Sequence, residues 1–246
     1  MKLRKLLSAS SKLRDKCEEI SLELIDEKII DYVYNPLDYA WEIHKEYLKL
    51  ASHGNPKCIL LGMNPGPHGM GQMGIPFAAS SIVRDLFGIT GIKVMQPKIP
   101  HPARPVLGLE YPRDEISGTR IWNLLSKLYK TRNSIFDNVF VVNHCPLMLF
   151  NGQRATNITP DKIKGLTVNK LLNACDQHLL EVSEILEADT VVGIGKYAEK
   201  RAKTVFDQTQ VQVKGCWHPS PASPLANRNN GKDWQENIIA VLPINK

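Results

Sequence analysis

The sequence predicts an α/β fold, a three-layer sandwich in which helices flank a central, four-stranded, mainly parallel sheet. Short apolar runs rich in β-formers alternate with longer helical segments, the pattern of a parallel sheet covered on both faces. The 246 residues contain no internal repeat and no linker-like segment, and this length suits one domain with a sizeable core. We therefore expect a single domain over residues 1–246, with a flexible N-terminus at 1–9.

The first part of the chain is predicted to be helical. A helix is expected over 10–30 because apolar residues recur there at steps of four, three and four, namely Leu13, Cys17, Ile20 and Leu24. The sequence Tyr34-Asn35-Pro36 breaks this pattern. A second helical stretch then runs to about Ser52.

The rest of the chain alternates between the two element types. Strands are expected near 57–62, 138–143, 189–194 and 210–216, and helices near 78–88, 118–130, 161–187, 196–207 and 233–240. Residues 93–117 contain five prolines and are expected to form a long irregular connection. Such connections are often functional in a compact domain.

Composition limits the classes of function. Lys and Arg number 31 against 25 Asp and Glu, a net charge of +6, which is compatible with a polyanionic partner because neutralised phosphates release counterions. Five scattered cysteines include no Cys-x-x-Cys pair, so a reducing compartment is favoured over disulfides or a zinc knuckle. No run approaches the ~18 apolar residues of a membrane span, and no signal peptide is visible. We expect no metal, no cofactor and no membrane partner.

One motif stands out directly after the apolar run 58–61. Residues 62–71 read Gly-Met-Asn-Pro-Gly-Pro-His-Gly-Met-Gly, with four glycines and two prolines in ten positions. Such a segment cannot continue a strand, but its backbone can press against a flat ligand and aim N–H groups at it. The motif therefore predicts an active-site loop that presents the amide of Asn64.

A second polar motif follows the last expected strand. Residues 216–221 read Cys-Trp-His-Pro-Ser-Pro. Asn64 follows the first strand, Asn143 ends the second and His218 follows the last. Because ligands bind beyond the carboxyl ends of parallel strands, these three side chains are expected to converge on one pocket.

Gly62–Pro67, together with Gln72, Gly74, Pro76 and Phe77, resembles the water-activating motif of the uracil-DNA glycosylase superfamily, in the version carried by its single-strand-selective monofunctional branch. The resemblance covers about residues 30–235. Further segments agree with it in order, namely Tyr34-Asn35-Pro36, Tyr39-Ala40-Trp41, Arg104–Glu110, 143–147 and 218–221.

The resemblance implies a uracil-DNA glycosylase-like fold and a base excision repair enzyme. The expected reaction is hydrolysis of the N-glycosidic bond of uracil and 5-hydroxymethyluracil in single- and double-stranded DNA, which leaves an abasic site. The partner is DNA with a flipped-out base, and the enzyme is expected to act as a monomer, nuclear in a eukaryote and otherwise cytoplasmic. No lysine lies in either motif, so we expect a monofunctional enzyme without a lyase step.

The resemblance also assigns roles at the site. Asn64 is expected to orient the attacking water, and His218 to stabilise the charge that develops on O2 of the leaving uracil. Asn143 can pair with both O4 and N3–H of uracil, and cytosine would reverse both partners. The substrate-binding set is Met63, Gly66, Met70, Phe77 and Asn143, in which Phe77 stacks on the base and the small Gly66 leaves room for a 5-substituent.

The DNA-binding residues are expected in two segments. The loop after the His motif carries the wedge that fills the gap left by the flipped base, and the segment around 152–160 supplies phosphate contacts. The expected residues are Arg154, Lys162, Pro219, Ser220, Pro221, Ala222, Ser223, Asn227 and Arg228. Ala222 stands where relatives often carry arginine, and Ala78-Ala79 stand where the family usually has Gly-Glu.

Other interpretations remain open from the sequence. Lys196 after Gly193-Ile194-Gly195 suggests a phosphate loop, but the full Gly-x-x-x-x-Gly-Lys-Ser/Thr pattern is missing. His101, His144 and His218 could be imagined as metal ligands, yet none has ligand spacing with a carboxylate. A mismatch-specific thymine/uracil glycosylase and a non-catalytic DNA-binding module on the same fold are the alternative functions.

Overall fold

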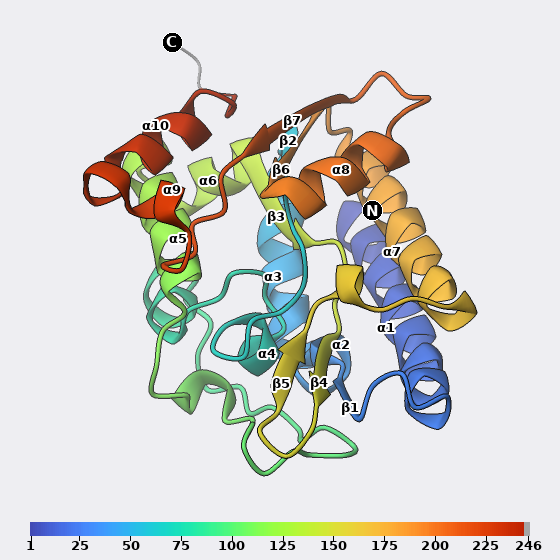
Figure 1. The fold of residues 1–246 in the computed structure, drawn as a ribbon. Helices are drawn as coiled ribbons and strands as arrows, with labels where there is room; N and C mark the ends of the chain where they lie inside the picture. Colours follow the sequence, from blue (N-terminus) through green and yellow to red (C-terminus); the bar gives the residue numbers. More distant parts are fainter. Residues whose placement is uncertain (244–246) are drawn as a thin grey trace.

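A four-stranded parallel sheet lies at the centre of the computed structural model, which describes residues 1–243 (Figure 1). Its strands lie in the order β3-β2-β6-β7. Their bounds are Cys58–Gly62 (β2), Val139–Asn143 (β3), Thr190–Ile194 (β6) and Gln212–Cys216 (β7). Every residue of β2, β3 and β6 is buried, so both faces of the sheet are covered. The predicted fold class and its four strands are confirmed.

The register of the sheet brings the strand ends level. Gly62, the last residue of β2, pairs with Asn143, the last residue of β3. On the other side Ile194 pairs with Cys216, which are the last residues of β6 and β7. Since all four strands are parallel, the loops that follow them emerge along one edge. Chain order also reverses around β2, with β3 on one side and β6 on the other, which is where open α/β sheets bind ligands.

Helices surround this sheet. In Figure 1, α1 and α7 lie side by side and α8 packs over β6 and β7. The longer helices are Lys2–Asp26 (α1), Trp41–His53 (α3), Ile116–Tyr129 (α5), Arg132–Asn138 (α6), Leu166–Leu186 (α7), Lys196–Val205 (α8) and Lys232–Ile239 (α10). The short ones are Pro36–Tyr39 (α2), Met70–Met73 (α4), Pro224–Asn227 (α9), a π-helical turn at Ile82–Leu86 and 3-10 turns at Gly108–Glu110, Pro160–Lys162 and Arg228–Gly231.

An aromatic cluster joins α3, α5 and α6 to the sheet. Tyr47 of α3 stacks on Phe140 of β3 and meets Trp122 and Phe136 edge-on. Its hydroxyl donates to the carbonyl of Val141 (2.7 Å) and accepts the N–H of the same residue (3.2 Å). Burial of such rings is a large hydrophobic contribution, and the buried hydroxyl remains fully paired.

The N-terminus differs from the expectation of a flexible segment at 1–9. Helix α1 begins at Lys2, and Leu6 and Ala9 are buried in the main core. Ala9 and Leu6 lie one and two helical turns before Leu13, on the same apolar face of the helix. The face of α1 that packs on α3 and α7 therefore extends to the start of the helix. The expected helix 10–30 also ends earlier, at Asp26.

A second, three-stranded antiparallel sheet was missed by the sequence analysis. Its strands are Tyr32–Tyr34 (β1), Met148–Asn151 (β4) and Thr156–Ile158 (β5), in the order β1-β4-β5. Each has three or four residues, too few for a recognisable alternation. The β1–β4 pairing joins segments more than a hundred residues apart, Tyr32 facing Phe150. Only the tertiary structure could create it.

Three expected helices differ from the prediction. The stretch 78–88 contains only the turn Ile82–Leu86, the stretch up to Ser52 is divided at Ala40 into α2 and α3, and 161–187 becomes a 3-10 turn followed by α7 from Leu166. Residues 93–115 are irregular apart from the turn at Gly108–Glu110, as expected from their prolines.

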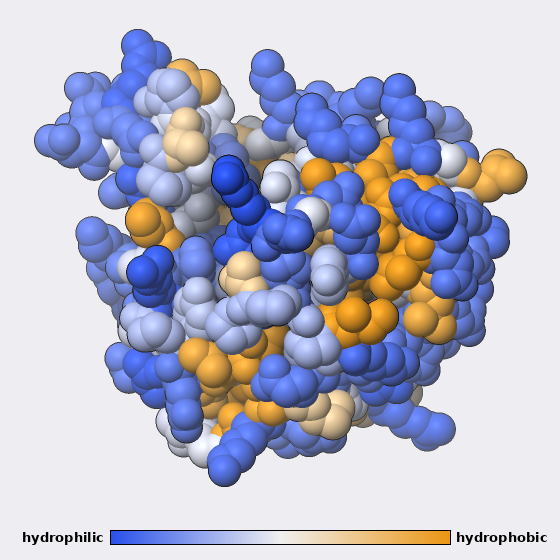
Figure 2. Space-filling view, turned by 60° about the horizontal axis from the view of Figure 1, so that its bottom comes forward, coloured by the Kyte–Doolittle hydropathy of each residue, from blue (hydrophilic) through white to orange (hydrophobic). Residues whose placement is uncertain are grey.

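Figure 2 shows one face, on which apolar residues gather in separate areas among hydrophilic ones. Exposed large apolar side chains include Leu22 in α1, Leu166 at the start of α7, and Met95, Ile99 and Leu107 in the irregular connection 93–115. Within residues 1–243, no helix has the length and apolar character needed to cross a membrane.

Helix packing at the N-terminus can be tested by truncating Leu6. Leu6→Ala removes a fully buried side chain and is expected to lower the free energy of unfolding by ~2–5 kcal/mol. Lys5→Ala, on the exposed side of the same turn, should change it by less than ~0.5 kcal/mol. Urea titration measures both. Equal stability of the two variants would mean that residues 1–9 do not pack as described.

Candidate active site

A cavity of about 440 Å³ opens beyond the carboxyl ends of the sheet strands. Its walls come from the loop after β2, the segment after α4, the end of β3, strand β5 and the residue after it, the residue before α5 and the loop after β7. The lining residues are Met63, Asn64, Pro65, Gly66, Phe77, Glu115, Asn143, Asn157, Thr159, His218 and Ser220. The level strand ends thus bring Asn64, Asn143 and His218 into one pocket, as the sequence motifs suggested.

The loop after β2 is held by hydrogen bonds along its length. The carbonyls of Gly62 and Met63 accept the N–H groups of His144 and Cys145, at 3.0 and 2.9 Å. Further on, the side chain of Gln72 donates to the carbonyls of Pro67 (2.9 Å) and Pro105 (3.1 Å). A loop fixed in this way loses little entropy when it holds a ligand, which is the basis of preorganised binding.

Gly62 allows two cavity side chains to lie against the end of β2. A Cβ at this position would overlap the Oδ1 atom of Asn143 and lie 2.6 Å from the Phe77 ring. The missing side chain therefore creates the space in which the Asn143 amide and the Phe77 ring meet.

Phe77 is held in a strained backbone conformation. Its φ is +53°, a region that bulky residues rarely adopt. The indole N–H of Trp122 donates to its carbonyl (3.1 Å), and a Cβ at Gly118 would overlap that same carbonyl. These contacts turn the ring toward His218, with 5.9 Å between ring centroids. Phe77 is both buried and a cavity wall, which the sequence could not decide.

His218 lies in the cavity as a neutral ring with a defined tautomer. Its Nδ1 accepts the backbone N–H of Ser220 (3.1 Å), so this nitrogen carries no proton and Nε2–H is the donor. Burial lowers the pKa of His218 below its usual 6.5, because a buried cation loses its hydration. At pH 7 the ring therefore offers one neutral N–H donor.

Several polar atoms of the cavity have no hydrogen-bond partner among residues 1–243. They are Nδ2 of Asn64, Oδ1 of Asn143 and Oε2 of Glu115. The Asn143 amide nitrogen lies 3.2 Å from the sulfur of Met70, which is a weak acceptor. Because buried polar groups are normally paired, this cluster of unpaired donors and acceptors indicates a binding site for a polar ligand.

Residues 49–242 match the Uracil DNA glycosylase superfamily. A Bos taurus protein named single-strand selective monofunctional uracil DNA glycosylase is 38% identical over 246 residues, which cover 97% of this chain and 87% of that protein. A Rattus norvegicus protein named single-strand selective monofunctional uracil-DNA glycosylase is 43% identical over 219 residues, covering 87% and 78% respectively.

This chain belongs to the uracil-DNA glycosylase superfamily. It is a uracil-DNA glycosylase, a DNA repair hydrolase that acts on N-glycosyl bonds. The fold is also similar to the crystal structure of wild-type SMUG2 from Pedobacter heparinus. The matched residues make up 85% of this chain and 86% of that protein, with a TM-score of 0.61 and 15% sequence identity.

Glu115 is the member of the glycosylase cavity that sequence reasoning missed most clearly. The residue directly precedes α5 and is half-buried as a whole, but its carboxyl is enclosed, and burial raises its pKa to about 7. Nothing in the local sequence distinguishes it from the exposed acid Asp114. Asn157 and Thr159, at the end of the missed strand β5, also line the cavity.

The loop after His218 is anchored to α5 by one arginine. Arg120 donates to the carbonyl of Pro219 (2.9 Å) and to Oδ1 of Asn227 (2.9 Å). The amide of Asn227 in turn donates to the carbonyl of Pro221 (2.7 Å). Of the residues expected in this loop to bind DNA, Ser220 lines the cavity, Pro219 is buried, and Pro221, Ala222, Asn227 and Arg228 are exposed, with Ser223 half-buried.

The expected phosphate-binding residues Arg154 and Lys162 lie on exposed turns at either end of β5. They do not line the cavity. Met70 lies behind the cavity, against Asn143. Met63 and Gly66 line it directly.

The structure gives little support to a phosphate loop at Lys196 or to a metal site at the histidines. Lys196 begins α8 after Gly195, whose φ is +87°, and a Cβ there would lie 3.4 Å from His218, so this turn is a close strand-to-helix connection. His101 bonds to the carbonyl of Gly152 and His144 to Asp176. In residues 1–243 no three metal-binding side chains are grouped to hold an ion.

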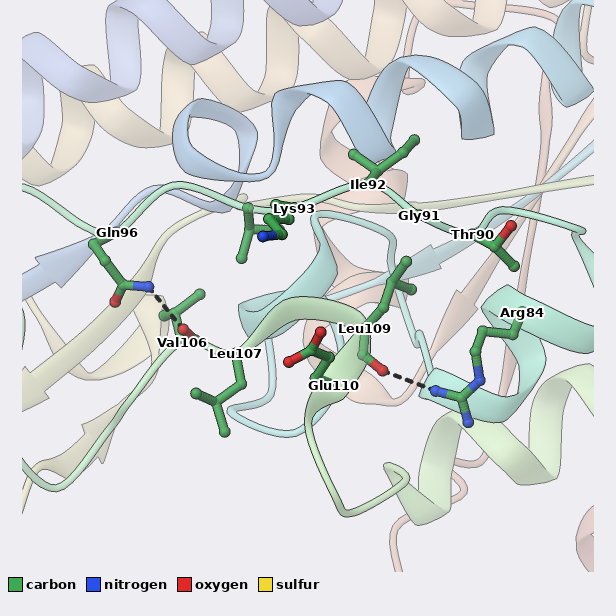
Figure 3. A pocket seen from close by; sticks show the side chains of 11 residues that line it. Arg84, Thr90, Gly91, Ile92, Lys93, Gln96, Val106, Leu107, Leu109 and Glu110 are labelled. Carbon is green, nitrogen blue, oxygen red and sulfur yellow. Dashed lines mark hydrogen bonds between the residues drawn. The ribbon is translucent and has the colours of Figure 1, made fainter.

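A larger cavity of about 620 Å³ lies away from this site (Figure 3). Two of its polar side chains form hydrogen bonds to other lining residues. Arg84 donates to the carbonyl of Leu109 (2.8 Å) and Gln96 donates to the carbonyl of Val106 (2.9 Å). None of the site residues expected from the sequence lines it. Size alone therefore does not mark the active site.

The close packing at Gly62 predicts a sharp mutational effect. Gly62→Ala should push the Asn143 amide and the Phe77 ring out of place and reduce uracil release by about 10²-fold or more. Gly91→Ala adds a methyl group to open space at a φ of +71°, so it should lower stability by about 1 kcal/mol without reducing base release. Gel-based excision assays and thermal unfolding measure both effects. Normal excision by Gly62→Ala would contradict the described contact.

The raised pKa of Glu115 predicts a pH-dependent stability. The pKa of Glu115 is 4.5 in the unfolded chain and about 7 in the folded one. At pH values between these two, the folded chain keeps a proton that the unfolded chain has released. The contribution of Glu115 to stability is therefore present at low pH and is lost as the pH rises through 7. Glu115→Gln cannot titrate. The melting temperature of the parent should therefore fall more from pH 5 to pH 8 than that of Glu115→Gln, whereas exposed Glu110→Gln should follow the parent. Identical profiles for all three would contradict the buried state of Glu115.

Proposed function

We propose that this uracil-DNA glycosylase removes uracil and 5-hydroxymethyluracil from single- and double-stranded DNA, acting as a monofunctional monomer on a flipped-out base. The observation that carries the proposal is the set of unpaired polar atoms from Asn64 and Asn143 beside the neutral N–H donor of His218, all on one cavity. Each of these groups matches a different requirement of the reaction.

Asn143 supplies base recognition. Its Oδ1 can accept N3–H of uracil while its Nδ2 donates to O4. Cytosine presents an amino group and an unprotonated N3 at the same positions, so both Asn143 atoms would face like partners. A buried site that pairs with its substrate in this way rejects the wrong base strongly. The ring of Phe77 offers a stacking surface for the base, a contact worth ~1–3 kcal/mol.

His218 and Asn64 act on the bond that breaks. As the bond between C1′ and N1 lengthens, negative charge collects on O2 of the uracil, and a neutral Nε2–H of His218 held in place stabilises it without reorganisation. An amide has no basic pKa near neutrality, so Asn64 accepts a hydrogen bond from the attacking water and orients it toward C1′. A largely dissociative reaction needs no stronger base.

The remaining features support the wider substrate range and the mode of DNA binding. Gly66 lines the cavity without a side chain of its own, so the wall there consists of its backbone and the Glu115 carboxyl, polar groups beside which a 5-hydroxymethyl group can lie. The loop held by Arg120 projects exposed residues beside the cavity mouth, where a wedge would replace the flipped base. Arg154, Lys162 and Arg228 are exposed cations available to DNA phosphates.

Base release from matched single- and double-stranded oligonucleotides, each with one uracil or one 5-hydroxymethyluracil, tests the proposal. The parent should release both bases and leave the abasic strand uncut. His218→Leu should lose ~10²–10³ in rate, and Asn64→Ala should lose most activity. His53→Leu and Asn55→Ala change exposed residues that precede the start of β2, at the end of the strand opposite the cavity, and are matched controls that should keep the parent rate.

Each part of the proposal can fail separately. Absence of release by folded parent, together with equal binding to uracil-containing and normal DNA, would favour the non-catalytic module. Release of uracil without 5-hydroxymethyluracil would remove the second substrate. Cleavage of the strand without alkali would contradict the monofunctional reaction.

A further inference from the structure

One buried acid in the cavity has no role in the reaction as proposed. The carboxyl of Glu115 lines the same cavity as Asn64, Asn143 and His218. It makes no hydrogen bond to any of residues 1–243, and its Oε2 atom is inaccessible. Burial alone raises its pKa, so no neighbouring charge compensates it. An enclosed, unpaired carboxyl is costly to folding, and a ligand contact would explain why it stands there.

The carboxyl lies against the glycine loop after β2. A Cβ at Gly66 would lie 2.8 Å from Oε2 and 3.2 Å from Oε1 of Glu115, and a Cβ at Gly69 would overlap Oε2. The carboxyl thus occupies the space that side chains at 66 and 69 would otherwise fill. Met70, the next residue of this loop, contacts the Asn143 amide. Glu115, Gly66 and Asn143 line this wall of the cavity, and Met70 connects the glycine loop to Asn143 from behind it.

The order of atoms around a pyrimidine ring decides which edge meets this wall. With Asn143 paired to N3–H and O4, and His218 at O2, the next atom after C4 is C5. C5 therefore lies beyond O4, on the opposite side of the Asn143 contacts from O2 and His218. Because Glu115 packs against the glycine loop, whose Met70 contacts the Asn143 amide, a base held in this way by Asn143 would present its C5 edge to the Glu115 carboxyl.

We propose that Glu115 is a specificity-determining residue that reads the substituent at C5 of the bound pyrimidine, pairing with a hydroxyl group there and disfavouring a methyl group. This inference rests on the proposed function, because it uses the base orientation set by Asn143 and His218. It assigns Glu115 to substrate selection, and neither to water activation nor to charge stabilisation on O2.

Hydrogen-bond chemistry explains the selection. A hydroxymethyl group can donate to and accept from a carboxyl in either protonation state. Uracil has only a hydrogen at C5, which leaves room for a bridging water. A 5-methyl group covers the carboxyl and leaves it unpaired, and this loss corresponds to about a ten- to hundredfold lower rate. A cavity wide enough for a hydroxymethyl group admits a methyl group by size alone, so a polar contact is needed to separate the two.

The test compares rates of base release in the full chain from single-stranded oligonucleotides carrying uracil, 5-hydroxymethyluracil or thymine. Glu115→Met replaces the carboxyl with an unbranched apolar side chain of similar length. It should reduce the ratio of 5-hydroxymethyluracil to thymine excision by about ten- to hundredfold. Glu115→Gln keeps a donor and an acceptor and should retain most of the parent ratio. Glu110→Met, at an exposed site on the separate cavity of Figure 3, should leave the ratio unchanged.

The outcomes separate this inference from the proposed function. A parent that releases no uracil contradicts the proposed function itself. A parent that releases uracil, with the same ratio in Glu115→Met as in the parent, overturns the inference alone. Loss of selection in Glu115→Gln as complete as in Glu115→Met also overturns it, because hydrogen bonding would then not be the cause. If Glu115→Met does not fold, Glu115→Ala, which removes the carboxyl without adding apolar bulk, gives the same comparison.

Discussion

The active site depends on the level ending of two parallel strands, β2 and β3, at a position without a side chain. Gly62 pairs with Asn143, and the backbone continues the pairing one step beyond the sheet, from His144 to Gly62 and from Cys145 to Met63. These bonds fix the direction in which the glycine loop leaves the sheet. Because Gly62 has no Cβ, the Asn143 amide and the Phe77 ring can share the space above it. A side chain there would displace both walls of the cavity.

Burial in this cavity disfavours charge on its titratable side chains. The pKa of His218 is lowered and that of Glu115 is raised, so both shifts favour the neutral form of the group. This suits a reaction whose leaving group becomes an anion. A fixed negative charge nearby would oppose departure of the base, whereas a neutral N–H donor stabilises it. Low polarity of the surroundings also strengthens each hydrogen bond that the site makes.

The cavity is held by elements far from the reacting atoms. Helix α5 and the residue before it contribute at three positions: Glu115 directly before the helix, Arg120 to the loop after His218, and Trp122 to the carbonyl of Phe77. Gln72 connects the glycine loop to residues 105–107 of the irregular connection, donating to Pro105 and accepting from the Leu107 N–H (2.8 Å). The Pro-rich connection thus supports the active-site loop. Strain at Phe77 persists because these neighbours determine its position.

The parallel sheet and the two loop motifs that carry Asn64 and His218 could be predicted from local sequence. Long apolar strands alternating with helices leave few other folds, and Gly-Met-Asn-Pro-Gly-Pro and His-Pro-Ser-Pro are local signals that do not depend on distant contacts. Long-range contacts create the antiparallel sheet β1-β4-β5, the packing of residues 2–9 and the place of Glu115. Pairing of short strands and enclosure of a carboxyl arise from residues many positions apart, and local propensity carries no information about such contacts. An acid before a helix has the same local sequence signature whether it faces solvent or, like Glu115, the substrate cavity.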